Sequence, residues 1–378
     1  MKEIPFYKAQ IDKKEEDLIK SALYNSDIRY SEIFEEDICK YFGVKHAVST
    51  TSGTTALHLA LCAMDIKRGD KILCSVNSFP NVAEVIRHFD AEPVFVDIDP
   101  ISFNITSESL ARTIDQNRHK KLKCAFISHI AGLAADIDAI SEVAKSENII
   151  LIDDACRAMG ATYKGAKIGA LKSSLISCFQ INPQAQDAIS TAGFFVTNDD
   201  EIANAAQILR NGGIVGDAFY KDGNMSFTYD IDRIGQKYDL NAINSAYAIA
   251  QFEKTDAFIK RRKQIAAAYR EQLANCPHVT LPSDSEEHIY TQFIVKIDKN
   301  RDDFAKALIS RGVSVSLHYV PVHLLSYYKN KYNYKVNDFP NALKNYQQIL
   351  SLPIYTALSD DDVSYICEQI KEIAQNRV

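Results

Sequence analysis

The sequence predicts an α/β protein whose larger part is a mainly parallel, doubly wound sheet. Short runs of β-branched residues alternate with helical patterns from about residue 44 to 200. Such alternation implies right-handed crossovers, with helices on both faces of a parallel sheet. The chain has 378 residues, of which 46% are hydrophobic. A chain of this size buries a large core, and its length favours two domains or one domain with an appendage.

The expected elements follow one another in a regular order. Strands are expected at VKHAVST, KILCSV, EPVFVDID, KCAFISHI, NIILIDD, SLISCFQ and GFFVTN, and helices at TTALHLALCAM, VAEVIRHF and IDAISEVAKSE. Helical patterns follow at 201–211, 240–274 and 302–311, with strand-like runs at HIYTQFIVKID and VSVSLHYV. We therefore expect a large domain, 1–250, and a smaller C-terminal α+β domain, 251–378, that begins as a βαβ unit. The tyrosine-rich run HLLSYYKNKYNYKVNDF is expected to be an ordered surface loop, with a flexible lid as the alternative.

Composition excludes several classes of partner. The formal charge of -6 and the pI near 5.9 argue against a nucleic acid or a membrane surface, which a basic patch would bind. The eight cysteines are scattered without CxxC pairs, which favours a reducing compartment. No apolar run approaches the roughly 20 residues of a membrane span, and the N-terminus has no apolar signal core. We expect a cytoplasmic protein with small-molecule or protein partners.

The run TTSGTTALHLAL, residues 50–61, predicts a strand that ends in a turn before a helix. Free backbone N–H groups and the helix dipole make such a turn an anion site, and a glycine lets a phosphate approach the backbone. Ser52, Gly53 and Thr54 are therefore candidate phosphate ligands. The alternative is an ordinary helix N-cap with no ligand.

Two further runs place chemistry just past strand ends. In ILIDDACRAMG, residues 150–160, paired acids follow an apolar strand, and ligands of open parallel sheets bind at that edge. Asp154 is thus a candidate partner for a cationic ring nitrogen, with a helix-capping acid as the alternative. In SVNSFPNVAEVI, Phe79 precedes a helix and is placed to stack on a flat ring, unless it belongs to the core.

The run LHYVPVHLL, residues 317–325, groups His318, Tyr319 and His323 around a proline-containing turn. Two histidines five residues apart suggest a metal site, but no nearby cysteine or acid completes a ligand set. We favour a substrate-pocket or structural role for the three residues, and we expect no metal.

Together these runs resemble the DegT/StrS-like sugar aminotransferases, a branch of the fold-type I enzymes that use pyridoxal 5'-phosphate (PLP). FEEDICKYFGVKHAV, SGTTALHLAL, PVFVDID, HIAGLAADIDAI, IDDACRAMGATYKGAKIG, GQKYDLNAINSAYAIAQFE, LHYVPVH and SLPIY occur in the family's order over nearly the whole chain. The resemblance implies that the turn at 52–54 binds the PLP phosphate, Phe79 stacks on the ring and Asp154 pairs with its nitrogen.

The same resemblance implies roles for two basic residues. Arg157 stands where the family usually has histidine or glutamine near the cofactor's phenolic oxygen, a change that a cation there tolerates. Lys237, in KYDL, corresponds to a loop that reaches the partner subunit's cofactor phosphate. The family therefore implies a homodimer with shared sites, which cycles between PLP and pyridoxamine 5'-phosphate (PMP) with L-glutamate as amino donor and a keto sugar as acceptor.

The sequence departs from the family where the cofactor-binding lysine belongs. Aligned back from VTN at 196–198, that position is Ala185, and no lysine lies between Lys172 and Lys221. Gln180 replaces a serine that helps to hold the phosphate, and Asn182 replaces a histidine. The chain should therefore transaminate poorly or not at all, because a methyl group neither binds the cofactor covalently nor moves a proton.

Two explanations account for Ala185: a Lys-to-Ala change that traps the substrate–cofactor adduct, or a natural relative that binds cofactor without transaminating. The changes at 180 and 182 leave the acceptor open between a nucleotide-linked sugar and a smaller phosphorylated ketone. A PLP- or PMP-dependent sugar dehydratase and a non-catalytic PLP-binding protein are also compatible with the missing lysine.

Overall fold

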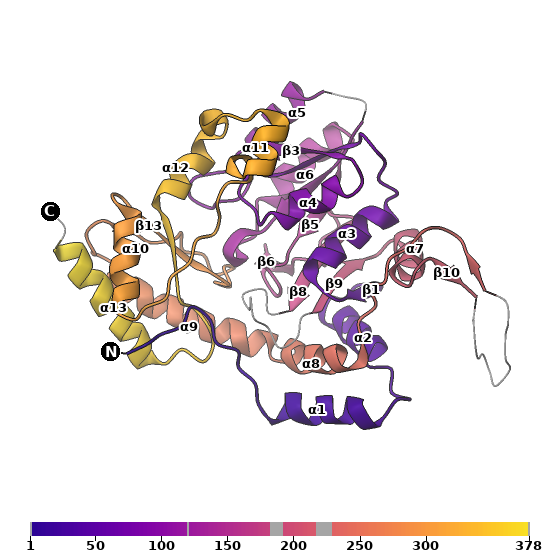
Figure 1. Ribbon diagram of the computed structural model, residues 1–378, viewed down its shortest axis with the longest axis horizontal. Helices are drawn as coiled ribbons and strands as arrows, with labels where there is room; N and C mark the ends of the chain where they lie inside the picture. The colour runs from indigo at the N-terminus through magenta and orange to yellow at the C-terminus, as the bar shows by residue number, and fades with distance from the viewer. Residues whose placement is uncertain (1, 119–120, 182–191, 217–228, 377–378) are drawn as a thin grey trace.

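The computed structural model describes residues 2–118, 121–181, 192–216 and 229–376 (Figure 1). Its centre is a seven-stranded sheet of order β1-β9-β8-β5-β4-β2-β3. The strands β2, β3, β4, β5 and β8 run parallel to one another, whereas β9 is antiparallel to both of its neighbours. The strands are β1 (His46–Thr50), β2 (Lys71–Ser75), β3 (Glu92–Val96), β4 (Leu122–Ser128), β5 (Ile150–Asp154), β8 (Ile176–Ile181) and β9 (Ala192–Thr197). The predicted mainly parallel sheet is confirmed.

Both faces of this sheet are buried, because alternate side chains of one strand enter different cores. On β8, Ile176 and Cys178 join the larger hydrophobic cluster, whereas Phe179 and Ile181 join a second cluster. This period of two follows from the pleat of a strand. The helices packed around the sheet are α1 (Lys13–Tyr24), α2 (Tyr30–Phe42), α3 (Gly53–Ala63), α4 (Asn81–Arg87), α5 (Ser107–Gln116), α6 (Ile137–Ser146), α7 (Asp200–Arg210) and α8 (Ala242–Glu253).

A third hydrophobic cluster lies almost entirely within the last 115 residues and includes Ile4 from the N-terminus. It surrounds an antiparallel sheet of order β12-β13-β14. The elements here are α9 (Thr255–Leu273), β12 (Val279–Thr280), β13 (Phe293–Ile297), α10 (Arg301–Ser310), β14 (Ile349–Leu352) and α13 (Asp360–Gln375). The division at 250/251 stays a prediction.

The prediction that this region begins as a βαβ unit is wrong. VSVSLHYV adds no strand to the small sheet: Val313 forms an isolated bridge with Ile4, and Ser316 forms one with Ser351. Beyond them the chain crosses to the large sheet, where Val322 N–H donates to the carbonyl of Val76 at 2.8 Å. The alternation of apolar residues in VSVSLHYV fits a regular strand, but it also fits a segment that forms isolated bridges with different partners. The sequence pattern therefore did not distinguish a strand from such a segment.

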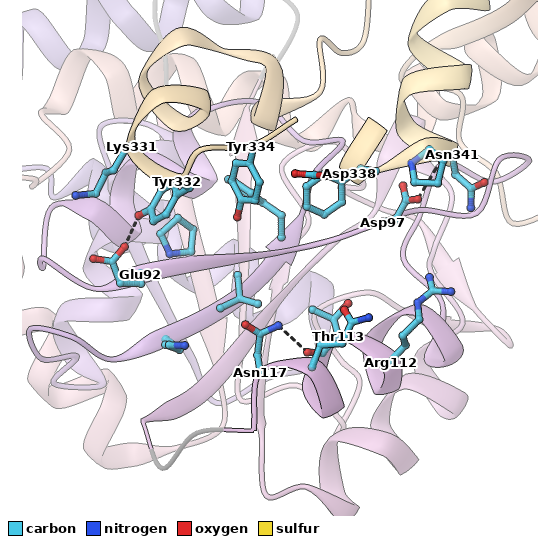
Figure 2. Close-up of a pocket in the computed structure, with 17 residues that line it drawn as sticks. Glu92, Asp97, Arg112, Thr113, Asn117, Lys331, Tyr332, Tyr334, Asp338 and Asn341 are labelled. Carbon is cyan, nitrogen blue, oxygen red and sulfur yellow. Dashed lines mark hydrogen bonds between the residues drawn. The ribbon is translucent and has the colours of Figure 1, made fainter. Parts of the chain in front are cut away.

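The tyrosine-rich run is helical rather than a loop. It forms α11 (Ser326–Tyr332) and the 3-10 turn η3 (Val336–Asp338), and its last residue, Phe339, precedes α12 (Pro340–Gln348). Phe95 of β3 contacts Tyr328 and Tyr334, with ring centroids 5.6 and 5.7 Å apart. A cavity of about 900 Å³ separates this segment from α5 (Figure 2). It runs along the edge strand β3, from Glu92 at its amino end to Asp97 just past its carboxyl end, and it is not lined by Ser52, Gly53, Thr54, Phe79 or Asp154.

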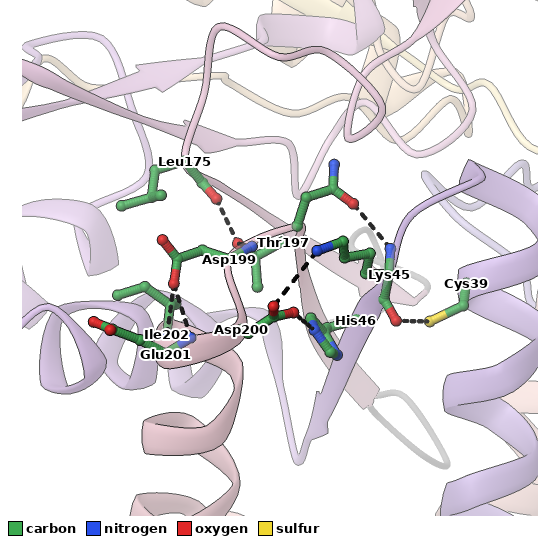
Figure 3. Close-up of polar contacts among 10 residues, drawn as sticks. Cys39, Lys45, His46, Leu175, Thr197, Asp199, Asp200, Glu201 and Ile202 are labelled. Carbon is green, nitrogen blue, oxygen red and sulfur yellow. Dashed lines mark hydrogen bonds and ion pairs between the residues drawn. The ribbon is translucent and has the colours of Figure 1, made fainter.

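Polar contacts fix the edge strand β1 to α7 (Figure 3). The Asp200 carboxylate lies 2.6 Å from His46 Nε2 and 3.5 Å from Lys45 Nζ. Asp199 caps α7 by accepting the N–H groups of the next helical residues. These contacts hold β1 antiparallel to β9 and thereby set the direction in which β1 delivers the chain to the turn at 52–54.

Candidate active site

The turn after β1 is built as a helix N-cap. The Ser52 hydroxyl accepts the Thr55 N–H at 3.2 Å, and the Thr55 hydroxyl accepts the Ser52 N–H at 2.9 Å. The Thr54 hydroxyl accepts a hydrogen bond of 3.0 Å from the side-chain amide of Asn81 on α4. This reciprocal capping satisfies some of the free donors of α3, and the remaining N–H groups of its first turn face the carboxyl edge of the sheet.

Two glycines let the backbone pack closely at this turn. A Cβ on Gly53 would lie 2.8 Å from both Cys156 Sγ and Gln180 Oε1, and one on Gly193 would lie 2.0 Å from the Ser52 carbonyl oxygen. Gln180 is half-buried and pairs with Gly193 across β8 and β9. Cys156, just past β5, and Gln180 of β8 thus meet the turn directly, in the kind of close approach for which glycine is needed.

The two acids at the end of β5 have different surroundings. Asp153 is fully buried and accepts the hydroxyls of Ser174 and Ser177 at 2.8 and 2.6 Å, so it joins β5 to β8. Asp154 is half-buried and accepts the Ser128 hydroxyl of β4 at 2.9 Å. Burial, followed by the charge of Asp154, raises the pKa of the adjacent Cys156 thiol well above its usual range. Because Asp153 is fully buried and Asp154 only half-buried, Asp154 is the acid of this pair that a ligand can reach.

Phe79 is not a core residue. Its side chain is 54% exposed and meets the ring of Tyr319 edge-on, with centroids 6.1 Å apart. Tyr319 is buried, and its N–H lies 3.4 Å from the Asn77 side-chain oxygen. The segment around Tyr319 thus lies beside the loop that follows β2.

Arg157 joins the end of β5 to the same C-terminal segment. Its Nε donates to the Tyr319 hydroxyl at 3.1 Å, and its carbonyl accepts the Thr291 hydroxyl at 2.7 Å. Gln292 Nε2 donates to the Tyr319 hydroxyl at 3.3 Å. The terminal nitrogen Nη1 of Arg157 is buried and has no hydrogen-bond partner within the described part of the chain.

The two histidines of LHYVPVH have separate environments. His318 Nδ1 lies 2.8 Å from the Ser351 hydroxyl, and its ring stacks on Phe6. Burial, followed by the nearby charge of Arg157, lowers the pKa of His318 to about 3. His323 is fully buried, and its Nε2 lies 3.1 Å from the Val336 carbonyl. The structure brings Tyr319 to Arg157 and Phe79. His323 instead belongs to the tyrosine-rich run and contacts Val336 within it.

Lys237 lies at the surface, with its side chain 76% exposed. Its Nζ is 2.8 Å from the Asp239 carboxylate and donates to the side-chain oxygen of Asn211 at 3.2 Å. The neighbouring Tyr238 carbonyl accepts the Thr51 N–H at 3.2 Å, so this loop borders the turn at 52–54. Asn182 and Ala185 lie outside the described residues.

Sequence reasoning missed three residues of this arrangement: Ser128, Thr291 and Gln292. Ser128 lies inside the expected strand KCAFISHI and ends the observed strand β4 beside the one that carries Asp154, so the rule that strand ends share an edge identifies it only once the end of β4 is known. Thr291 and Gln292 sit in a run expected to be a strand, and nothing in their spacing indicates contact with Arg157.

None of the described helices has both the length and the apolar character needed to cross a bilayer.

Comparisons with known proteins agree with this fold. Residues 7–371 match the model of the DegT/DnrJ/EryC1/StrS aminotransferase family. An uncharacterized protein of Methanocaldococcus jannaschii is 34% identical over 91% of this chain and 90% of its own. The spore coat polysaccharide biosynthesis protein SpsC of Bacillus subtilis is 31% identical over 90% and 89%.

Among solved structures, DesV of S. venezuelae superimposes with a TM-score of 0.86 at 26% identity, over 96% of this chain and 95% of its own. Structures of this fold include PLP and PMP forms, and PLP is the cofactor of the family. With its fold and nearly its whole length matched, the chain belongs to the DegT/DnrJ/EryC1/StrS family of PLP-dependent aminotransferases.

Proposed function

We propose that the protein is built to move an amino group from L-glutamate to a keto group of a nucleotide-linked sugar in the cytoplasm. The observation that carries the proposal is the convergence of an anion turn, an exposed aromatic ring and a half-buried acid at one edge of the sheet. The name of SpsC, a polysaccharide biosynthesis protein, supports a sugar acceptor, and the eight unpaired cysteines support a reducing compartment.

The residues present fit PLP. Gly53 and Gly193 leave no room for a Cβ around the turn, so we propose that Ser52, Gly53 and Thr54 hold the phosphate there. Phe79, whose exposed ring has no core to cover, would lie against the flat face of the pyridine ring. Asp154, held by Ser128, would keep the ring nitrogen protonated. When bound, the cofactor supplies an electron sink for the reacting carbon.

Gln180 and Asn182 differ from the family where the phosphate and the substrate would bind. Gln180 contacts the position of a Gly53 Cβ, so its amide replaces the hydroxyl of the usual serine beside the phosphate. We propose Asn182, His318 and Tyr319 for the substrate side. His323, which contacts the Val336 carbonyl, would act there only through the packing of its segment.

We propose that position 185 carries lysine in the active form of the enzyme. An amine there would accept and return the proton that moves during transfer, work that general acid–base groups accelerate by about 10²–10⁴-fold. The test is Ala185→Lys, followed by absorbance on addition of L-glutamate. We expect borohydride to fix the cofactor to the introduced lysine in this variant, and glutamate to convert the cofactor to PMP.

Four outcomes would redirect the proposal. A lysine variant that binds the cofactor covalently and never turns over with glutamate points to a PMP-dependent sugar dehydratase or a non-catalytic binding protein, for which the missing lysine is the supporting observation. Deoxy product from a keto sugar identifies the dehydratase. Amine product from a small phosphorylated ketone, and none from a nucleotide sugar, changes the acceptor. A variant that never binds covalently shows that position 185 does not face the ring.

We further propose a homodimer with shared sites. Large apolar side chains are exposed around the arm of β10 (Ile214–Val215) and β11 (Asp230–Ile231): Ile231 is 51% and Ile234 87% exposed. Exposed apolar side chains of this size mark interaction surfaces when they form a contiguous patch. Lys237 follows the arm and would reach the partner's phosphate. A monomer at micromolar concentration with full affinity for PMP would contradict this proposal.

A further inference from the structure

Three buried polar atoms around Tyr319 have no hydrogen-bond partner within the described residues. They are Arg157 Nη1, Asn77 Nδ2 and Gln292 Oε1. Each belongs to a side chain that contacts Tyr319 through another of its polar atoms. Buried polar groups are normally paired, and leaving one unpaired costs about 1–3 kcal/mol. Three such atoms around one residue indicate a site that a ligand completes.

The chemistry of these atoms defines the ligand. Asn77 Nδ2 is a neutral donor and Arg157 Nη1 a cationic one, and Asn77 is 2% exposed. The Tyr319 hydroxyl oxygen already accepts from Arg157 Nε and Gln292 Nε2, at 3.1 and 3.3 Å, so its own hydrogen is left to donate. Donors thus outnumber acceptors, and one of them carries a positive charge. This set favours an oxygen ligand with negative charge.

Tyr319 fixes the direction of the guanidinium. Its hydroxyl holds Nε of Arg157 on one side, while Thr291 holds the Arg157 carbonyl on the other. An arginine side chain carries about 2 kcal/mol of rotamer entropy, and the hydrogen bond at Nε removes part of that freedom before any ligand arrives, while the Thr291 contact fixes the backbone. The Nη1 donor is therefore preorganised beside the end of β5, three residues after Asp154.

We propose that Arg157, Asn77 and Tyr319 form a binding site for an anionic oxygen, in which Tyr319 is the positioning residue for Arg157. The inference rests on the proposed function, because the site adjoins the residues proposed to hold the cofactor. Two ligands carry the required oxygen: the phenolic oxygen of the cofactor ring and a carboxylate of the amino donor. An arginine suits either one better than the histidine or glutamine usual in the family.

The experiment measures binding to the chain with alanine at 185, so that turnover does not interfere. Isothermal titration gives the dissociation constants for PMP, which carries the ring oxygen, and for glutarate, which carries only carboxylates. The variants are Arg157→Gln, Arg157→Lys, Tyr319→Phe and, as a control that removes an exposed positive charge on α11, Lys329→Gln. The ultraviolet absorbance of bound PMP reports the ionisation of the ring oxygen independently of affinity.

We expect Arg157→Gln to weaken one of the two ligands by about tenfold, the loss of one charged hydrogen bond. Weaker PMP with a shifted absorbance band identifies the ring oxygen, and weaker glutarate with unchanged PMP identifies the carboxylate. Arg157→Lys should restore part of the loss because it keeps the charge. Tyr319→Phe should reproduce a smaller loss for the same ligand, whereas Lys329→Gln should leave both constants unchanged.

Unchanged affinities and absorbance in Arg157→Gln would overturn this inference while leaving the proposed function intact. An equal loss in Lys329→Gln would also overturn it, since the effect would then come from the general loss of a positive charge. An unsubstituted chain that binds neither PMP nor glutarate would contradict both proposals. Urea unfolding of each variant shows whether a weak binder is folded, and Arg157→Lys provides the comparison if Arg157→Gln is not.

Discussion

His318 should make the protein sensitive to acid. Its ring is 8% exposed and lies between Phe6 and Tyr319, and burial lowers its pKa from 6.5 to about 3. The folded chain thus keeps this histidine neutral at pH values where the unfolded chain protonates it. Because the unfolded state then binds the extra proton, stability is complete above about pH 6.5 and falls as the pH drops.

The size of the effect follows from the two pKa values. Between about pH 7.5 and about pH 5, a folded pKa of about 3 and an unfolded pKa of 6.5 together lower the free energy of unfolding by about 2 kcal/mol. His318→Gln removes the titration, and its amide keeps a partner for the Ser351 hydroxyl. The variant is expected to be less stable at neutral pH, yet to lose about 2 kcal/mol less than the unsubstituted chain on acidification.

Urea unfolding at several pH values measures the difference between the two chains. The comparison does not depend on how much stability the variant loses at neutral pH, since only the change with pH is compared. Two more buried histidines, His58 and His288, have pKa values lowered by burial to about 4 and about 3 and act in the same direction in both chains. Parallel curves for the two chains would refute the reasoning.

Two further predictions concern single contacts. Gly193→Ala places a Cβ 2.0 Å from the Ser52 carbonyl, so we expect it to displace the turn and abolish PMP binding in a titration. Retained affinity in a folded variant would contradict a phosphate site there. Lys254→Ala leaves the carboxylate of Glu15, whose side chain is 1% exposed, without its cation. We expect a loss of about 3–5 kcal/mol in urea unfolding, against under about 1 kcal/mol for the exposed Lys14→Ala; equal losses would argue against the buried pair.

The sequence predicted the large sheet well because each strand is a short apolar run bounded by turn residues. It placed the turn at 52–54 after a strand and Asp154 at a strand end for the same reason, since both stand where a run ends, and their roles toward a ligand stay predictions. It failed for the run around Val313, where alternation is satisfied by isolated bridges with Ile4 and Ser351. Contacts between distant segments, such as Arg157 with Tyr319, leave no mark in the spacing of either segment.

The candidate site residues differ in how strongly they indicate a ligand. Ser52 caps α3 whether or not a phosphate is bound, and Gly193 is required by the approach of the Ser52 carbonyl. Both would persist in a relative that has lost its cofactor, because the fold needs them. They therefore support the fold more than the chemistry.

The exposed ring of Phe79 and the Nη1 group of Arg157 are different, because the fold gains little from either. A phenylalanine ring that is 54% exposed leaves apolar surface in water, at about 25 cal/mol for each Å² not buried. A buried guanidinium nitrogen also lowers stability when no atom of the described residues accepts a hydrogen bond from it, as at Arg157 Nη1. Since both costs vanish when a flat ring with an anionic oxygen binds, these two residues are the observations that a purely structural role leaves unexplained. They favour a chain that still binds its cofactor despite alanine at 185.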